Sequence, residues 1–108
     1  MTGGYASKFL DVDLTKQKVK DTRFDDEVLE MFFGGRGLAA KILWDRLGKK
    51  WSEVDPLGPD NLLIALTGPM TGIYPGGRIC VSGKSPMSNG TVGSTASTEF
   101  AHELKCAG

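Results

Sequence analysis

Residues Thr67–Lys84 read TGPMTGIYPGGRICVSGK, and the rest of the chain is arranged around them. An apolar run, Leu62–Leu66, leads into this stretch, and a second apolar segment follows Arg78. Because Gly76 and Gly77 carry no Cβ, the main chain there can approach a flat or bulky partner closely. Arg78 adds a planar, permanently charged set of donors at the same place. The stretch predicts a surface for a large anionic ligand, although a Gly-rich hairpin with an exposed arginine has the same pattern.

The composition limits the chain to one small domain and excludes some classes of partner. The 108 residues carry 13 basic and 13 acidic side chains, so no basic excess indicates nucleic-acid binding. Glycine is the outlier, because 15 residues are about twice the usual share of roughly 7%. These glycines are clustered rather than periodic, which favours loops shaped by the backbone.

Targeting and metal-binding signals are sparse. The chain shows neither a leader nor an apolar run of membrane length, which predicts a cytoplasmic protein. Cys80 and Cys106 are too far apart for a CxxC motif, and His102 is a lone histidine. A [4Fe–4S] cluster needs four thiolates, so this chain cannot supply one by itself.

The N-terminal part predicts a hairpin followed by two helices. Strands over Lys8–Leu14 and around Val19–Arg23 pair antiparallel, with one solvated face and one apolar face formed by Leu10, Val12 and Leu14. Asp25 or Asp26 can cap a helix that stops at Gly34 and Gly35. A second helix spans Leu38–Leu47, with Gly48 in the C′ position. The apolar side of this helix consists of Leu38, Ile42, Leu43 and Leu47, and Trp44 and Trp51 are assigned to packing.

The C-terminal part predicts strands over Leu62–Leu66 and Ile79–Ser82, then a polar run, Ser94–Thr98, before a helix that carries Phe100, Ala101 and Leu104. Hydroxyl groups in that run can cap the helix, and uncapped N–H groups at a helix start bind anions. A capped helix without a ligand explains the same residues. The predicted fold class is therefore α+β, a β-rich layer of antiparallel strands with a few short helices. The last helix ends at Gly108 without a returning strand, which suggests a domain cut short.

Seven short motifs occur in the order seen at the start of the tungsten-containing aldehyde ferredoxin oxidoreductases, and the chain resembles that family over nearly its whole length. The motifs are FLDVDLT at Phe9–Thr15, GGRGLA at Gly34–Ala39, DPLGPDN at Asp55–Asn61, TGPMTG at Thr67–Gly72, GGR at Gly76–Arg78, KSP at Lys84–Pro86 and ELKCAG at Glu103–Gly108. The resemblance implies that residues 1–108 are part of the N-terminal domain of a larger enzyme. In this family that domain supports a bis-pterin cofactor of tungsten or molybdenum, and later domains supply the cysteines of the [4Fe–4S] cluster.

The resemblance also assigns roles to individual residues. Arg78, after Gly76 and Gly77, matches the family arginine that lies between the pterin and the iron–sulfur cluster. Thr95, Ala96 and Ser97 match the segment that contacts the pterin phosphates, and the main-chain carbonyl of Thr95 matches a ligand of a bridging magnesium. The sequence departs from well-known members, which have asparagine in place of Thr95 and glycine in place of Ser97, so the phosphate contacts are less secure than the carbonyl contact.

The activity implied by the resemblance is oxidation of an aldehyde and water to a carboxylic acid, with electrons passing through the cluster to ferredoxin. No residue here suits the general base of that reaction. Glu99, His102 and Glu103 share one side of the last predicted helix and are assigned to a solvated face rather than to a metal site. Cys80 is assigned to a small buried apolar position.

Two other hypotheses compete with an enzyme fragment. The chain could be a free-standing module or accessory subunit that binds a pterin or another phosphorylated small molecule without catalysis, or a structural piece without a ligand. Continuation of the reading frame into cysteine-bearing domains would favour the enzyme fragment, whose partners are then the remaining domains and ferredoxin. The sequence leaves open the aldehyde, the choice between tungsten and molybdenum, and whether the parent is a dimer or another homo-oligomer. For the isolated chain we expect no aldehyde oxidation.

Overall fold

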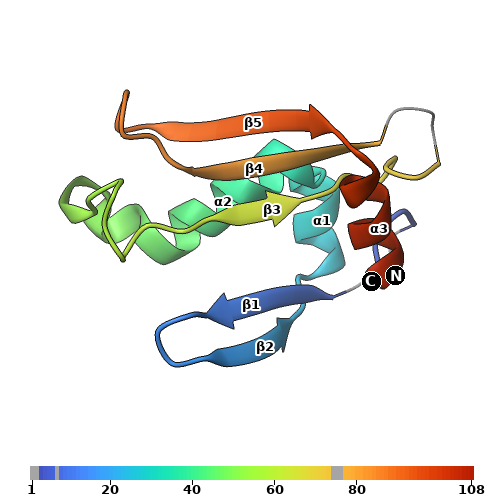
Figure 1. Ribbon diagram of the computed structural model, residues 1–108, viewed down its shortest axis with the longest axis horizontal. Coiled ribbons are helices and arrows are strands. Elements are labelled where there is room, and N and C mark those ends of the chain that lie inside the picture. Colours follow the sequence, from blue (N-terminus) through green and yellow to red (C-terminus); the bar gives the residue numbers. More distant parts are fainter. Residues whose placement is uncertain (1–2, 7, 74–76) are drawn as a thin grey trace.

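The computed structural model describes residues 3–6, 8–73 and 77–108, and it has the α+β fold with antiparallel sheets that the sequence predicts (Figure 1). A two-stranded sheet pairs β1 (Phe9–Asp13) with β2 (Lys18–Thr22). A three-stranded antiparallel sheet has the order β3 (Ile64–Leu66), β4 (Arg78–Lys84) and β5 (Thr91–Ser97). The long strand β4 is therefore central, and β3 and β5 form the two sides of this sheet.

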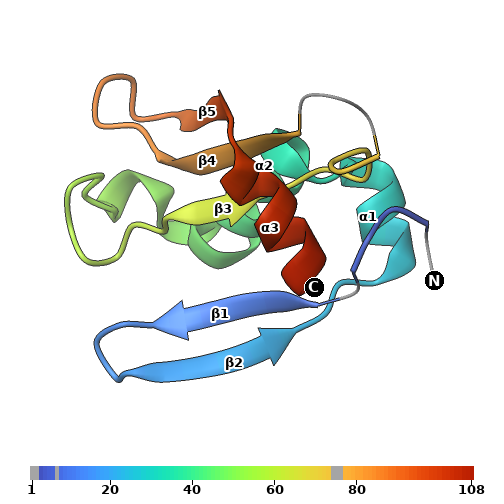
Figure 2. The same cartoon turned by 45° about the vertical axis from the view of Figure 1, so that its right-hand side comes forward.

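Three α-helices and one 3₁₀ helix accompany the strands. They are α1 (Asp26–Phe32), α2 (Gly35–Leu47), the 3₁₀ helix η1 (Gly48–Glu53) and α3 (Glu99–Ala107). Figures 1 and 2 show α2 and α3 on opposite sides of the three-stranded sheet. Across the described ranges, no helix combines the length and the hydropathy that crossing a bilayer requires.

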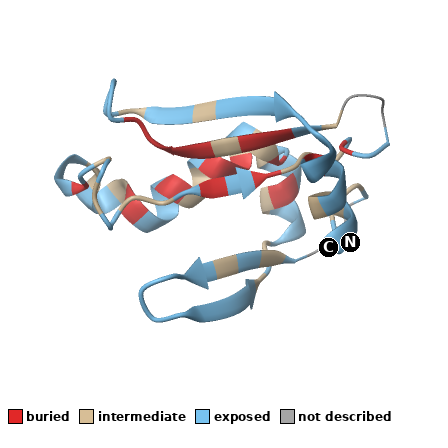
Figure 3. Cartoon of the chain, viewed as in Figure 1, coloured by how far each residue is buried: buried red, intermediate tan, exposed pale blue. Residues whose placement is uncertain are grey.

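The core lies between α2 and the sheet, where the buried residues gather (Figure 3). Leu38 and Leu43 of α2 are fully buried, and Ile64 and Leu66 project from β3 into the same cluster. Burying one leucine side chain contributes about 1.5–3 kcal/mol, so these helical positions hold α2 on the sheet. The predicted apolar side of this helix is confirmed, with Ile42 half-buried at its margin.

A glycine break fixes where α2 begins. Phe33, after α1, is left-handed with φ 59°, and Gly34 follows with φ 67°. A Cβ on Gly34 would lie 3.0 Å from the carbonyl oxygen of Thr67, and the Gly35 amide donates to that same oxygen at 3.2 Å. The break therefore holds the first turn of α2 against the loop that opens Thr67–Lys84.

The predicted end of α2 at Leu47 is confirmed, but its predicted start and the predicted C′ conformation of Gly48 are wrong. The helix begins at Gly35, three residues before Leu38, and Gly48 has right-handed helical angles (φ −54°, ψ −41°) instead of those of a C′ glycine. The chain continues directly into η1, and Lys84 of β4 donates hydrogen bonds to the carbonyls of Trp51 in η1 and of Val54 just after it. Trp51 is half-buried and its ring N–H donates to the Asn89 carbonyl at 2.8 Å, whereas Trp44 is 75% exposed and does not pack in this core.

The hairpin of β1 and β2 is confirmed, but its predicted apolar face is turned outward. Leu10 is 65% exposed and Leu14 is 84% exposed. The opposite face carries Phe9, whose ring meets that of Phe24 edge-on at 4.7 Å, and Asp11, which pairs with Arg46 of α2. Alternation shows that the two faces differ, but an ion pair and an aromatic pair decide which face meets the rest of the chain.

The polar run before α3 forms a strand, whereas the sequence predicted an irregular segment that caps the helix. Ser94–Ser97 belongs to β5, which pairs with β4 along its whole length. Pairing with an existing strand satisfies backbone groups that the hydroxyl side chains of an isolated segment would otherwise bond. Thr98 alone caps α3, and its side chain accepts from the Ala101 amide at 3.4 Å.

Candidate functional site

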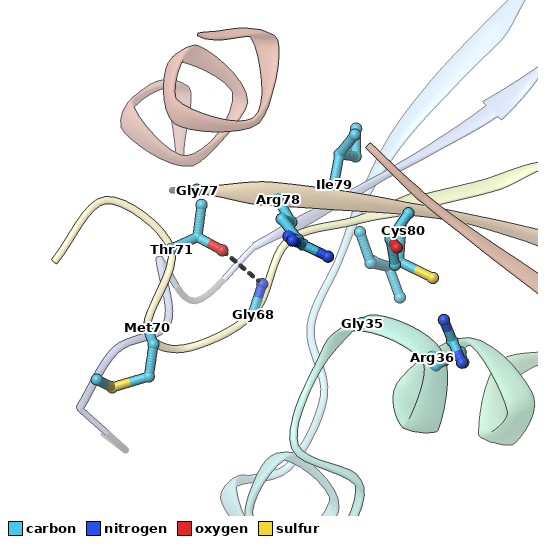
Figure 4. Close-up of a pocket in the computed structure, with 11 residues that line it drawn as sticks. Gly35, Arg36, Gly68, Met70, Thr71, Gly77, Arg78, Ile79 and Cys80 are labelled. Atoms are coloured by element: carbon cyan, nitrogen blue, oxygen red, sulfur yellow. Dashed lines mark hydrogen bonds between the residues drawn. The ribbon is translucent and has the colours of Figure 1, made fainter. Parts of the chain in front are cut away.

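A cavity of about 580 Å³ lies between the start of α2, the loop after β3 and the α2-facing side of β4 and β5 (Figure 4). Its size is in the range of ligand sites. The lining residues are Gly35, Arg36, Leu66, Gly68, Met70, Thr71, Gly77, Arg78, Ile79, Cys80 and Thr95. The stretch Thr67–Lys84 and the glycine break before α2 thus meet at one place.

Strand register places most of the predicted site residues together. Arg78 of β4 is opposite Ser97 of β5, and Cys80 is opposite Thr95. Because side chains alternate along a strand, these four share the face that looks toward α2, and Ala96 points to the other face. Gly77, Arg78 and Thr95 line the cavity, and Ser97 lies beside Arg78 in the ladder. Gly76 lies outside the described residues.

Because residues 94–97 form a strand, the expected anion site does not lie at the start of α3. The start of α3 has its own cap from Thr98, and Glu99 adds a negative charge to its first turn. A capped helix start with an acidic residue is a poor place for an anion. The polar run instead contributes one wall of the cavity through Thr95, as part of a sheet.

The loop wall of the cavity is tied in place by several hydrogen bonds. The Gly68 amide donates to Thr71 Oγ1 at 3.0 Å, and the Thr71 amide donates to the Gly68 carbonyl at 3.2 Å. Lys105 of α3 donates through Nζ to the Gly68 carbonyl at 2.9 Å and also to the Gly4 carbonyl. Burial lowers the pKa of Lys105, so α3 holds this wall through a partly desolvated ammonium group.

Two cationic side chains lie among the mostly apolar residues that line the cavity. Arg36 enters from α2 and Arg78 from β4, and no acidic residue is among the described lining residues. Within residues 3–6, 8–73 and 77–108, neither guanidinium has an ion pair or a hydrogen bond, since the ion pairs there join Lys41 to Asp45 and Arg46 to Asp11. The cavity therefore presents unneutralised positive charge in a molecule whose net charge is zero.

Arg36 was not identified as a site residue from the sequence, where it appeared only as part of a family motif. It is distant from Arg78 along the chain, and only packing of α2 on the sheet brings the two to one cavity. Two features of the sequence could have indicated Arg36 as a site residue. A cationic residue in the first turn of a helix opposes the helix dipole, and a glycine within a strand often marks a close approach by another group.

The remaining polar groups have the surroundings predicted for them. Cys80 is 6% exposed, and its Sγ lies 3.4 Å from Ser82 Oγ, in keeping with a small buried residue. Glu99, His102 and Glu103 are all exposed, as expected for a solvated helix face. His102 nevertheless packs closely, because a Cβ on Gly72 would lie 3.2 Å from its Nδ1.

Comparisons with known proteins agree on one family. Residues 9–108 match the family described as aldehyde ferredoxin oxidoreductase, N-terminal domain. The chain is 57% identical over 104 residues to the aliphatic sulfonate oxidoreductase, WOR-like subunit, of Pyrococcus furiosus, covering 96% of this chain and 17% of that protein. It is 37% identical over 107 residues to the tungsten-containing aldehyde ferredoxin oxidoreductase of Pyrococcus abyssi, covering 97% of this chain and 17% of that protein.

A solved structure has the same fold. The active site complex BamBC of benzoyl coenzyme A reductase, in complex with 1,5 dienoyl-CoA, is similar to this chain with a TM-score of 0.85 and 37% sequence identity. The similarity covers 100% of this chain and 16% of that chain. The chain thus spans about a sixth of the length of the relatives it matches.

Proposed function

The chain belongs to the aldehyde ferredoxin oxidoreductase family, as its N-terminal domain, and from this we propose that residues 1–108 form part of the surface that holds a tungsten-pterin cofactor in a longer oxidoreductase. The observation that carries the proposal is Arg78, whose guanidinium has no ion pair with another described residue and lines a cavity that no described acidic residue lines. Arg78 is exposed, and a guanidinium without a partner among the described residues is available to bind an anionic ligand.

The residues present fit a large anionic cofactor. A guanidinium can donate to ring acceptors and phosphate oxygens at once, and Gly77 leaves the backbone uncovered beside it. Thr95 adds a hydroxyl on the same face of the sheet. Gly76, which the resemblance assigns to the same loop, is retained in the proposal on sequence grounds alone.

The β5 strand is proposed to contact the phosphate side of the cofactor. It is an outer strand of the described sheet, so alternate backbone groups on its free side have no strand partner. Such carbonyls are suitable ligands for Mg²⁺, which prefers oxygen donors. We assign the Thr95 carbonyl to a bridging magnesium, and backbone or side-chain groups of Ala96 and Ser97 to the phosphates. Replacement of the asparagine and glycine of well-known members does not affect a carbonyl contact.

The proposed activity of the longer protein is the oxidation of an aldehyde to a carboxylic acid, chemistry that the tungsten centre supplies when bound. The role of this chain is to bind and orient the cofactor. Ferredoxin is the proposed electron acceptor, through a [4Fe–4S] cluster whose four thiolates must come from elsewhere in the polypeptide, since this chain has two cysteines.

A second substrate class is favoured by one observation. The identity to the aliphatic sulfonate oxidoreductase subunit is 57%, against 37% to the aldehyde enzyme of Pyrococcus abyssi. An alkanesulfonate is therefore the alternative substrate. Reduction of a viologen dye by the full-length polypeptide, with an aliphatic aldehyde and with an alkanesulfonate in parallel, separates the two.

The cofactor role is tested by Arg78→Ala in the full-length polypeptide that contains this chain. We expect the variant to fold but to retain much less tungsten and pterin after gel filtration, measured by mass spectrometry of the metal and fluorescence of the released pterin. Arg46→Ala removes a guanidinium from α2 outside the cavity and serves as the control. Retention of both components by Arg78→Ala at the control level would contradict the proposal.

A further inference from the structure

Arg36 lies directly against the backbone of β5. A Cβ built on Gly93 would be 2.4 Å from Arg36 Cγ and 2.9 Å from both its Cδ and its Nε. No residue with a side chain can occupy position 93 unless the arginine moves away. The aliphatic part of the Arg36 side chain therefore packs on the uncovered backbone of Gly93, a contact that we call the Gly93 seat, and Arg36 lines the cavity from there.

The placement of Arg36 is electrostatically unfavourable for the chain alone. Arg36 is in the first turn of the 13-residue helix α2, where the helix dipole is positive, and that turn contains no acidic residue. Its side chain is exposed, and among residues 3–6, 8–73 and 77–108 it has no hydrogen-bond or ion-pair partner. An anion in the cavity would relieve the repulsion at this helix start.

The other groups of the cavity define the anion. Arg78 reaches the same space from β4 (Figure 4). Thr95 follows Gly93 by two residues on the same face of β5 and also lines the cavity. Two guanidinium groups and a hydroxyl without a carboxylate suit a phosphate group, because each guanidinium can bind two of its oxygens in parallel.

We propose that Arg36, seated on Gly93, binds a phosphate group of the pterin cofactor from the side of the cavity opposite Arg78. The inference rests on the proposed function and adds a second positioning residue to it. Arg78 and Arg36 would then hold the cofactor from two elements, β4 and α2, that are distant in the sequence.

The test measures how fast the full-length polypeptide loses its cofactor. Wild type, Arg36→Ala, Arg36→Lys, Gly93→Ala and the double variant Arg36→Ala with Gly93→Ala are loaded in the same host. Release of pterin is followed by fluorescence and release of tungsten by elemental analysis during dialysis. Arg46→Ala is the matched control on the same helix. Circular dichroism and the thermal midpoint of the cofactor-free proteins establish that each variant folds, and Arg36→Gln replaces Arg36→Ala if that variant does not.

We expect release from Arg36→Ala to be about 10-fold to 100-fold faster than from wild type, the range for loss of a hydrogen bond to a charged group. Arg36→Lys keeps the charge without the planar fork and should be intermediate. Gly93→Ala should resemble Arg36→Ala, and the double variant should be no worse than either single variant, because both changes remove the same contact.

The outcomes separate this inference from the proposed function. If Arg78→Ala loses the cofactor and Arg36→Ala retains it at the wild-type rate, the inference is wrong and the proposed function stands. If both retain it, both are wrong. If the two changes increased the rate of cofactor release additively in the double variant, Gly93 would act independently of Arg36. That result would contradict the proposed packing of Arg36 on Gly93.

Discussion

The side-chain amino group of Lys84 lies 5.2 Å from the centroid of the Trp51 ring and donates to the Trp51 carbonyl oxygen at 2.5 Å. The same Nζ donates to the Val54 carbonyl at 2.7 Å, and Lys84 is only 4% exposed. One buried cation at the end of β4 therefore holds η1 against the sheet through two hydrogen bonds. The ring and two carbonyls together compensate for its loss of water.

Lys84→Met should lower the free energy of unfolding by about 2 kcal/mol, because two carbonyl oxygens, one of them on buried Val54, lose their donor. Urea unfolding followed by tryptophan fluorescence measures the change. Exposed Lys49 provides the control, and Lys49→Met should change stability by less than about 0.5 kcal/mol. Equal stability of the two variants would show that the Lys84 contacts do not stabilise the fold.

Two glycines of α2 and η1 should respond to alanine with opposite signs. At Gly37 a Cβ would lie 2.3 Å from the Phe32 carbonyl oxygen, so Gly37→Ala should destabilise the protein by about 1–3 kcal/mol. At Gly48 the nearest atom to a Cβ is a side-chain carbon of Trp44 at 3.5 Å, and the backbone is helical. Gly48→Ala should therefore be neutral or stabilise by up to about 1 kcal/mol.

Thermal unfolding of these two variants also tests the right-handed helical conformation of Gly48. A strong destabilisation by Gly48→Ala would indicate that position 48 needs a glycine after all, as a left-handed C′ residue would.

Asp11 should make stability depend on acid pH. The hydrogen bond from the side chain of Arg46 holds the pKa of the Asp11 carboxyl below its ordinary value of 3.8. The unfolded chain then takes up the proton first, so the contribution is present above pH 3.8 and disappears as the pH falls through the lowered pKa. The pair is largely exposed, which limits its contribution at pH 7 to less than about 1 kcal/mol.

Asp11→Asn removes this dependence. Unfolding free energies measured between pH 2 and 6 should fall less steeply at the acid end for Asp11→Asn than for wild type. Asp21→Asn, on the neighbouring strand, is the control and should follow wild type. Parallel curves for all three proteins would refute the role given to the ion pair.

Thr98 should be the residue that caps α3. Thr98→Ala removes the acceptor of the Ala101 amide and should cost about 1 kcal/mol. Ser94→Ala changes a hydroxyl within β5 that was expected from the sequence to precede the helix, and it should have little effect on helicity. Helix content by circular dichroism and the thermal midpoint check both variants. An equal effect of the two substitutions would favour the prediction from sequence that several hydroxyl groups of residues 94–98 cap the helix.

Local sequence was a good guide where short-range patterns decide the structure. Alternation in β1 and helical spacing from Leu38 to Leu47 gave the correct element types. Part of the glycine-rich stretch Thr67–Lys84 lines a cavity, and its role as a ligand surface stays a prediction. The tungsten-family resemblance, carried by motifs at Gly34–Ala39 and Gly76–Arg78, is confirmed by the matching family. The roles of Arg78, Thr95, Ala96 and Ser97 remain predictions.

The α+β class follows from local sequence patterns, because hydrophobic period and backbone-restricting residues act over a few neighbours. Long-range packing sets which face of β1 turns inward, makes residues 94–97 a strand, and brings Arg36 and Arg78 to one cavity. Each of these depends on a partner that is distant in the sequence. A strand needs a second strand for its backbone hydrogen bonds, and a shared cavity needs two elements packed together, which no local pattern specifies.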